Sequence, residues 1–338
     1  MKSHAVVFTG PNQVAFQSIT CPDPGPDDVV IDVHHSWISN GTEGSFLRGE
    51  RISGDVAWRA GAPSPFPMVA GYQKVGRISA VGAGVLNFTV GDWVFASMSR
   101  VTGMFDNQYA GHVSPSVCDQ RSVHRLPTNL PPVAFAGLVL TQVGFNCGSR
   151  SSITSGQTAV VIGDGLVGQW AGQTLACRGA RVVMVGHHPE RLARFQRHGA
   201  TRLSDTDYAV ADVQALGMGP VQVLVDTIGQ VAALRKYLPL MARGGHMVIA
   251  GFYPSSGEVN LQASLEAFRN YEISFDLASG ATRERLDETL RWVADGRLDT
   301  LGCLTHRFPV EEAAEAWRLI QTKREPFLGV VLDWPASR

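Results

Sequence analysis

A glycine-rich turn in the middle of the chain has the spacing of a dinucleotide-binding site. It follows a short apolar run at 158–162 and has the pattern G-x-G-x-x-G. In such a turn the first glycine permits a sharp bend, the second lets backbone approach a pyrophosphate, and the third lets a helix pack on the strand. The amide groups at the start of that helix then face the phosphates. The predicted cofactor-binding residues of this turn are Gly163, Gly165, Leu166, Val167 and Gly168.

The segments around this turn supply the context that the pattern requires. Small and apolar residues recur at helical spacing over 169–178, and a second apolar run follows at 181–185. Strand, turn, helix and strand therefore fit within about thirty residues, as in a dinucleotide-binding βαβ unit. The alternative is a glycine-rich turn in another doubly wound fold.

The end of the second strand bears on which nicotinamide cofactor is bound. An enzyme that prefers NAD usually has Asp or Glu here to bind the ribose 2′-hydroxyl, and this chain has Gly186. Because this position has no acid, nothing here repels a 2′-phosphate. His187, His188 and Arg191 offer hydrogen-bond donors or positive charge. The pattern favours NADP(H), with NAD(H) also possible. Alternatively, Arg191 lies on the solvated face of the next helix.

Composition limits the classes of partner and compartment. A net charge of −1 gives no electrostatic case for nucleic acid or an anionic membrane, and no apolar run is long enough to span a bilayer. The five cysteines are scattered without a C-x-x-C pair, which argues against a disulfide framework. The first residues are typical of a strand and not of a signal peptide. We therefore expect a cytoplasmic protein with a small-molecule substrate.

The pattern of elements indicates two kinds of domain. Up to about residue 125 the chain has short alternating runs separated by turn residues, which is typical of a β-rich, barrel-like domain. Strands and helices then alternate, as in a parallel sheet. Helices are expected at about 282–295 and 310–321, with a last strand at 329–332. The strands expected in the parallel sheet are 158–162, 181–185, 222–226, 246–250 and 271–276.

This layout resembles the medium-chain dehydrogenase/reductase superfamily over nearly the whole chain. The resemblance implies an α/β protein with a GroES-like β-barrel substrate domain, a Rossmann doubly wound parallel-sheet domain, and an active site between them. It implies a substrate domain over 1–143, a nucleotide domain over 144–278, and a return to the substrate domain over 279–338, in a homodimer or homotetramer. The residues that carry it are Gly71–Ile78, Val81–Gly82, Phe88–Val94, the glycine turn, Val225–Thr227 and Gly244–Val248.

The zinc ligands of the superfamily are missing. Zinc-dependent members have Gly-His-Glu where this chain has Gly71-Tyr72-Gln73, and a Cys near Ser39 and Asn40. The third ligand would fall near 139–140, where both residues are aliphatic. A catalytic zinc needs about three N, S or carboxylate ligands. Four cysteines would form the structural zinc site between about 95 and 125, and this segment contains Cys118 alone. We therefore expect no metal.

Two strings point to one branch of the superfamily. Ile38–Glu43 and Gly71–Gly76 are similar to the dehydrogenases that act on the hydroxyethyl group of bacteriochlorophyllide. The chain departs from that branch at Gly186, where an acid is expected, and at Arg48–Pro67, which has the character of an insertion near the cleft.

Without zinc, a hydrogen-bond donor must polarise the substrate carbonyl. Tyr72 takes a zinc-ligand position and can donate or relay a proton, although a buried Tyr is also a common packing residue. By the resemblance, Thr42 matches the proton relay, Glu43 follows it where the superfamily has Asp, and Ser39 and Asn40 add polar contacts. Thr141 and Thr227 are assigned by the same resemblance to the cofactor site.

These residues predict a zinc-independent NAD(P)(H)-dependent oxidoreductase. It would interconvert a secondary alcohol and a ketone on a hydroxylated or ring-bearing metabolite. The alternatives are an NADPH-dependent reductase of an activated C=C bond, as in quinone and enoyl reductases, and a non-catalytic NADP(H)-binding sensor.

Overall fold

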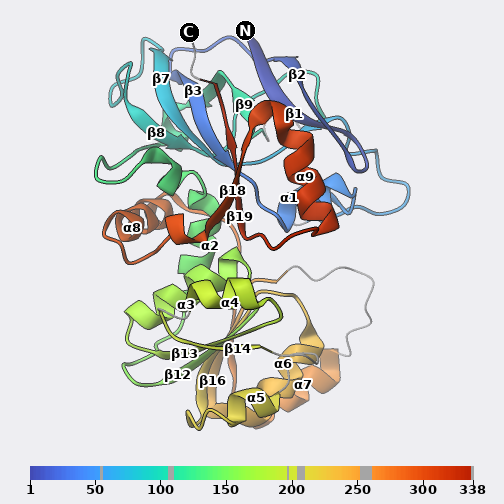
Figure 1. Cartoon of the computed structure of the whole chain (residues 1–338), viewed down its shortest axis with the longest axis vertical. Helices are drawn as coiled ribbons and strands as arrows, with labels where there is room; N and C mark the ends of the chain where they lie inside the picture. Colours follow the sequence, from blue (N-terminus) through green and yellow to red (C-terminus); the bar gives the residue numbers. More distant parts are fainter. Residues whose placement is uncertain (54–55, 106–109, 196–197, 204–209, 252–260, 336–338) are drawn as a thin grey trace. The chain divides into compact units, whose positions relative to one another are not determined.

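The computed structural model describes the chain except for residues 54–55, 106–109, 196–197, 204–209, 252–260 and 336–338, and it contains two compact units (Figure 1). Unit 1 comprises Met1–Val139, Leu286–Ala294 and Leu304–Arg338. Unit 2 comprises Leu140–Arg285 and Asp295–Cys303. The boundaries expected from the sequence were 143/144 and 278/279. They did not include the short return of the chain to unit 2 at Asp295–Cys303.

The centre of unit 2 is a six-stranded parallel sheet in the order β14-β13-β12-β15-β16-β17. The first strand in sequence lies in the middle, and the chain winds outward to each edge in turn, which is the Rossmann order. The five expected strands are present. The additional edge strand β14 was not predicted. The bounds are β12 (Thr158–Ile162), β13 (Arg181–Gly186), β14 (Ala200–Leu203), β15 (Val221–Asp226), β16 (Met241–Ile249) and β17 (Ser274–Leu277).

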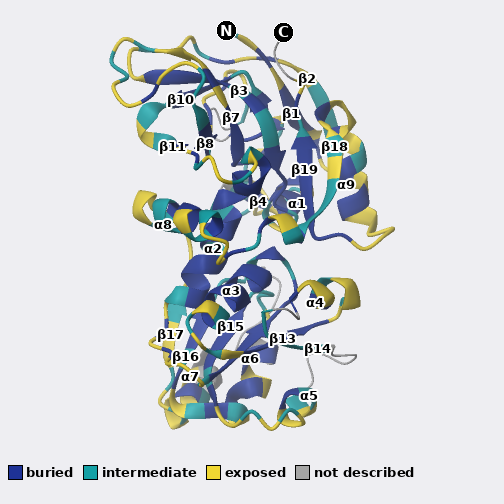
Figure 2. Cartoon of the chain, turned by 60° about the vertical axis from the view of Figure 1, so that its left-hand side comes forward, coloured by how far each residue is buried: buried dark blue, intermediate teal, exposed yellow. Residues whose placement is uncertain are grey.

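Helices cover both faces of this sheet. On one face, apolar side chains of α2 (Leu138–Ser149), α3 (Leu166–Cys177) and α4 (Pro189–Phe195) pack on the strands. On the other face, α5 (Val210–Gln214), α6 (Val231–Tyr237) and α7 (Leu261–Asn270) do the same. The central strands β12, β13 and β15 are buried almost throughout (Figure 2). Every residue of β12 is buried, which explains its unbroken run of apolar and β-branched residues.

Unit 1 is built from two larger sheets. One has the order β11-β8-β7-β3-β19-β18, with β10 also paired to β3. The other has the order β2-β1-β6, with β9 paired to β1. The bounds are β1 (Lys2–Gly10), β2 (Gln13–Thr20), β3 (Asp28–Trp37), β6 (Met68–Val69), β7 (Lys74–Val81), β8 (Trp93–Ala96), β9 (Val113–Ser114), β10 (Ser116–Asp119), β11 (Val123–Arg125), β18 (Leu304–Pro309) and β19 (Gly329–Asp333).

Shorter elements complete the described chain. The segment expected to be an insertion forms the small hairpin β4 (Arg51–Ser53) and β5 (Val56–Ala57). No helix in the described residues combines the length and the apolar character needed to cross a membrane. The remaining helices are α1 (Thr42–Leu47), α8 (Arg283–Ala294), α9 (Ala313–Thr322) and the 3₁₀ turns η1 (Gln120–Ser122), η2 (Pro132–Phe135), η3 (Leu238–Leu240), η4 (Leu301–Cys303) and η5 (Val310–Glu312).

The returning segment Asp295–Cys303 is bound to unit 2 by polar contacts. The backbone of Asp299 accepts a hydrogen bond from Trp170 Nε1 at 3.2 Å and donates one to Gln173 Oε1 at 2.8 Å. Arg194 of α4 donates to the carbonyl of Gly302 at 2.5 Å. These contacts hold the segment against α3 and α4, so unit 2 is not continuous in sequence.

Lys74 is a charged side chain in the interior of unit 1. It is fully buried, and its Nζ donates to the carbonyls of Ser97 and Ala110, both at 3.2 Å. Removal from water lowers the pKa of this amine, because burial disfavours the charged form. The contacts join the start of β7 to the chain on both sides of residues 106–109.

The C-terminal segment completes unit 1. Strand β19 pairs antiparallel with β3 and parallel with β18. Helix α9 packs on β2 and directs Trp317 into the core, where its ring meets Phe8 edge-on at 5.1 Å between centroids. Trp317 is 1% exposed. The last part of the chain therefore belongs to the hydrophobic core of the first.

We expect Trp317→Ala to lower the free energy of unfolding by about 3–5 kcal/mol, because it removes a fully buried aromatic ring. Denaturant unfolding followed by circular dichroism measures this. The control is Trp58→Ala, which removes a ring that is 37% exposed in the same unit. Equal losses in the two variants would show that α9 does not anchor the core.

Candidate functional site

Tyr72 lies in unit 1 between β6 and β7. Its side chain is buried, and its hydroxyl is hydrogen bonded to the side chains of Ser39 and Thr42. Burial raises the pKa of the phenol, and the nearby Glu43 carboxylate raises it further, against the opposing effect of the two hydrogen bonds. The hydroxyl therefore stays protonated at physiological pH and can donate a hydrogen bond. The structure brings Tyr72, Thr42 and Ser39 together.

Glu43 holds the turn that carries Ser39 and Thr42. Its Oε1 accepts from the Ser39 amide at 2.8 Å, and its own amide donates back to the Ser39 carbonyl at 2.9 Å. Its Oε2 lies 3.0 Å from Nε2 of His112, and the exposure of the two side chains is 1% and 0%. Both oxygens are thus used inside the protein. This arrangement supports an anchoring role for Glu43, whose carboxylate is paired with a buried His.

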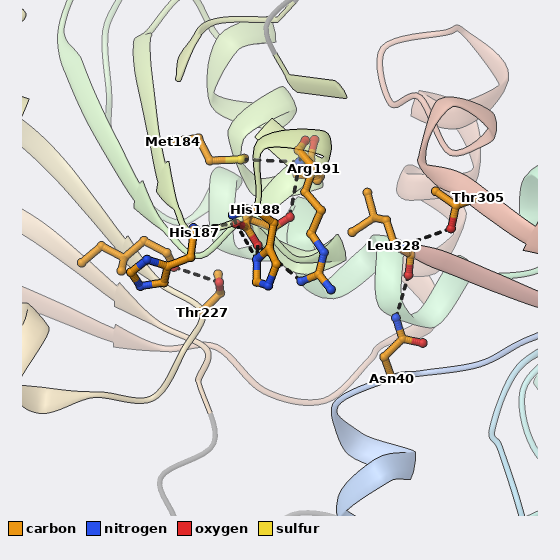
Figure 3. A network of polar contacts seen from close by, with 11 residues as sticks. Asn40, Met184, His187, His188, Arg191, Thr227, Thr305 and Leu328 are labelled. Carbon is orange, nitrogen blue, oxygen red and sulfur yellow. Dashed lines mark hydrogen bonds and ion pairs between the residues drawn. The ribbon is translucent and has the colours of Figure 1, made fainter. Parts of the chain in front are cut away.

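Two further polar side chains near this site, the predicted Asn40 and also Gln73, are bonded to neighbouring segments. Asn40 Nδ2 donates to the carbonyl of Leu328, just before β19, at 2.6 Å (Figure 3). Gln73 Nε2 donates to the carbonyl of Trp37 at 3.2 Å and is fully buried. These bonds tie Asn40 to the start of β19, and Gln73, the residue after Tyr72, to the end of β3.

The donor set around Tyr72 does not fit a catalytic zinc. A phenol hydrogen bonded to two hydroxyl groups stands at one ligand position, and hydroxyl side chains are poor substitutes for Cys, His or carboxylate. Glu43 and His112 have suitable atoms, but they bind each other. Among all described residues, no group of three or more His, Cys, Asp or Glu side chains is placed to hold a metal ion.

The glycine turn in unit 2 fits a nucleotide diphosphate. Gly163 has a φ of +110°, which favours glycine, and a Cβ on Gly168 would lie 2.0 Å from the Gly163 carbonyl oxygen. A Cβ on Gly165 would meet no atom within 4 Å. Gly165 is also the N-cap of α3, so no cap side chain covers the first amides of the helix, Leu166 and Val167. Two glycines are thus needed for packing, and the third leaves open space at a helix N-terminus.

Thr227, which directly follows strand β15, contacts the glycine turn. Its hydroxyl donates to the carbonyl of Ile162 at 2.9 Å and would lie 2.3 Å from a Cβ on Gly163. The preceding Asp226 is fully buried and accepts from the amides of Ile228 and Gly229 at 2.9 and 3.2 Å. Asp226 was not among the predicted site residues, although it lies in one of the strings that carry the resemblance. Thr141 is fully buried in α2.

The end of β13 is not free of acid, contrary to the sequence argument. The carboxylate of Asp164, the residue between the first two glycines, lies beside Gly186, and a Cβ on Gly186 would be 2.3 Å from its Oδ2. The amides of His187 and His188 donate to this oxygen at 2.9 and 2.8 Å. Asp164 was missed because spacing does not tell which way a side chain turns. The only signal was an acidic residue inside a glycine turn.

The predicted basic residues of the strand end divide into a pair and a single residue. His188 Nδ1 lies 3.0 Å from Asp164 Oδ2, and Arg191 NH1 lies 3.4 Å from Oδ1. Figure 3 shows these two side chains next to each other and His187 directed away from them. His188 and Arg191 therefore form one basic group held by Asp164.

Two family models match the chain. The one described as alcohol dehydrogenase GroES-like domain matches residues 25–130, and the one described as zinc-binding dehydrogenase matches residues 167–295. Together they span most of both units. Their order agrees with the barrel-like and Rossmann parts of the fold, so the fold class predicted from the sequence is confirmed.

Similar proteins come from sequence and from structure. The 2-desacetyl-2-hydroxyethyl bacteriochlorophyllide A dehydrogenase of Rhodobacter capsulatus is 26% identical and is covered, like this chain, over 100% of its length. A protein described as a zinc-binding dehydrogenase of Sinorhizobium meliloti 1021, solved bound to NADP, has a TM-score of 0.80 at 19% identity, with 98% of this chain and 99% of that chain covered. An alcohol dehydrogenase of Escherichia coli CFT073, solved with NADH, has a TM-score of 0.82 at 18% identity and the same coverage.

The two roles of glycine in the turn can be separated by substitution. We expect Gly168→Ala to lower the free energy of unfolding by about 1–3 kcal/mol, because its Cβ meets a backbone oxygen. We expect Gly165→Ala to cost less stability and to weaken NADPH binding, because its Cβ enters open space beside the helix amides. Thermal unfolding and fluorescence titration measure the two effects. NADPH bound equally well by Gly165→Ala and the unmodified protein would place the phosphates elsewhere.

Proposed function

Because the chain belongs to the medium-chain dehydrogenase/reductase superfamily, we propose that it is an NAD(P)(H)-dependent oxidoreductase that interconverts a secondary alcohol and a ketone without a catalytic zinc. The observation that carries the proposal is the buried Tyr72 hydroxyl, hydrogen bonded to Ser39 and Thr42 at a position where zinc-dependent members have a ligand. The similarity to a dehydrogenase named for a hydroxyethyl group supports a secondary alcohol on a ring-bearing compound as the substrate class.

The chemistry divides between the cofactor and the protein. Reduced nicotinamide, when bound, supplies a hydride to the carbonyl carbon. Negative charge then develops on the carbonyl oxygen, and a positioned donor stabilises it before a proton is transferred. In this proposal Tyr72 is that donor. Its raised pKa keeps the proton on the phenol until the oxygen becomes strongly basic.

Thr42 supplies the next step in this proposal. It begins α1, is partly exposed, and is hydrogen bonded to Tyr72. A hydroxyl that both donates and accepts can return a proton to the phenol from water. Glu43 keeps this turn in place through the Ser39 amide, and His112 holds the far oxygen of Glu43. Ser39 and Thr42 thus orient the Tyr72 hydroxyl, and Glu43 orients both.

The glycine turn is the proposed site for the cofactor diphosphate, and the basic group at the end of β13 is the proposed site for a 2′-phosphate. This favours NADP(H), with NAD(H) as the second choice. Product analysis separates the proposed reaction from reduction of a C=C bond: the first yields a hydroxyl group, and the second a saturated bond. A protein that binds NADPH and turns over no ketone, alcohol or enone would instead be a sensor.

Tyr72→Phe should lower the rate of hydride transfer by about a hundred- to a thousandfold, because it removes one donor to the developing oxyanion. Thr42→Val should lower it less. Cofactor affinity should not change, and neither should the melting temperature, since the ring volume is nearly preserved. Single-turnover absorbance of NADPH with a panel of ring-bearing ketones measures the rate.

The control for this experiment is Tyr237→Phe, which removes the hydroxyl of a fully buried tyrosine in unit 2. Its rate should equal that of the unmodified protein. If Tyr72→Phe also kept the full rate and melted at a lower temperature, Tyr72 would be a packing residue and the proposed donor would be wrong.

We expect well under one zinc ion per chain in protein purified without a histidine tag, because the described residues offer no set of three suitable ligands. Mass spectrometry of the metal content measures this. Activity should also survive dialysis against a chelator. One tightly held zinc per chain, with activity lost on its removal, would contradict the proposal.

A further inference from the structure

The acidic residue at the end of β13 is Asp164, which belongs to the glycine turn. In the Rossmann pattern the acid at this place belongs to the strand itself. In that pattern a carboxylate at the end of the second strand accepts hydrogen bonds from the ribose. Here the strand ends in Gly186, and the Asp164 side chain from the glycine turn occupies the space where a side chain at 186 would begin. The glycine at 186 and the acid at 164 are therefore a matched pair.

The Asp164 carboxylate is already saturated by protein donors. Its Oδ2 accepts from the amides of His187 and His188, and the His188 ring nitrogen lies 3.1 Å from Oδ1 and 3.0 Å from Oδ2. Arg191 also contacts Oδ1. A carboxylate offers about four acceptor positions. The side chain is 6% exposed. It has neither the free acceptor position nor the exposure that binding a ribose hydroxyl requires.

What Asp164 does instead is fix two basic side chains. His188 is held through Nδ1, so its other ring nitrogen is on the side away from the carboxylate, and 45% of this side chain is exposed. Arg191 is held on the same carboxylate, and its backbone carbonyl accepts from the buried Gln169 at 2.8 Å. Gln169 belongs to α3, directly after the glycine turn. The turn thus sets the position of the basic group from two sides.

We propose that Asp164 is a positioning residue for cofactor choice: it orients His188 and Arg191 to bind the 2′-phosphate of NADP(H), and it requires Gly186. The inference rests on the proposed nicotinamide cofactor. The simpler argument was that the 2′-phosphate can bind because the strand end has no acid. Here an acid is present, but its carboxylate is hydrogen bonded to protein groups. On this view, an added carboxylate at 186 would be repelled by Asp164 before it met any ligand.

The test measures binding of two nucleotides that differ by the 2′-phosphate. The unmodified protein should bind 2′,5′-ADP more tightly than 5′-AMP in calorimetric titration. Asp164→Asn should weaken 2′,5′-ADP binding by about tenfold or more and leave 5′-AMP nearly unchanged, because charge-assisted bonds to both basic residues are lost. The control is Glu272→Gln, which removes a carboxylate paired with Arg243 just before β17, at the opposite edge of the sheet. It should change neither affinity.

A second set of variants leaves Asp164 in place. His188→Gln and Arg191→Met should each weaken 2′,5′-ADP selectively, and they remain informative if Asp164→Asn does not fold. The exchange Asp164→Ala with Gly186→Asp should bind 5′-AMP more tightly than 2′,5′-ADP, because the new acid is free to accept from the ribose. Gly186→Asp alone should lower the melting temperature, since its side chain meets Asp164.

The outcomes separate this inference from the proposed function. If neither nucleotide nor NADPH nor NADH binds to the unmodified protein, the proposed cofactor is wrong. If the nucleotides bind and Asp164→Asn keeps the same ratio of affinities, the cofactor stands and Asp164 has no part in its choice. A protein that prefers 5′-AMP and loses this preference in Asp164→Asn would show that Asp164 binds the ribose itself, which overturns the positioning role.

Discussion

The nucleotide unit depends on how closely helix α3 approaches the end of strand β12. A single Cβ at Gly168 would stand 2.0 Å from the carbonyl oxygen of Gly163, so the helix can start here only if residue 168 lacks a side chain. Residue 163 must also be glycine, because its φ is positive and a Cβ there would lie 2.3 Å from the Thr227 hydroxyl. That approach directs the first amides of α3 outward, brings Thr227 against the turn, and sends the Asp164 side chain toward β13. The predicted phosphate site and the basic group beside it are therefore consequences of one steric limit.

Unit 1 relies on a different principle, the pairing of polar groups away from water. Glu43 and His112 are both almost fully buried, and a buried carboxylate costs free energy unless it is paired and hydrogen bonded. Here the carboxylate has a partner on each oxygen. The turn before α1 is fixed by these contacts, and Tyr72 is hydrogen bonded to that turn. The proposed donor thus gains its orientation from a turn that a buried ion pair holds in place.

Much of the fold follows from local sequence, because a buried parallel strand needs an apolar run and a glycine turn needs its spacing. Strands β12, β13, β15, β16 and β17 were predicted on this basis. Tyr72, Ser39 and Thr42 were named as site residues from the family resemblance, and not from a local pattern. The contacts that could not be predicted are between residues far apart or depend on side-chain direction. Glu43 and His112 are 69 positions apart. Lys74 is buried, although lysine is usually exposed to solvent. The Asp164 side chain lies beside Gly186, at the end of the neighbouring strand β13.

The path of the chain between the units also has a consequence for how the protein can be divided. The segment Asp295–Cys303 is held on α3 and α4, and α9 follows it to fill the core of unit 1 with Trp317. No single cut therefore yields two complete pieces. A fragment that ends before residue 286 leaves Trp170 without its acceptor and Phe8 without its aromatic partner. To move either unit intact into another protein, one would have to join segments that are separate in this sequence.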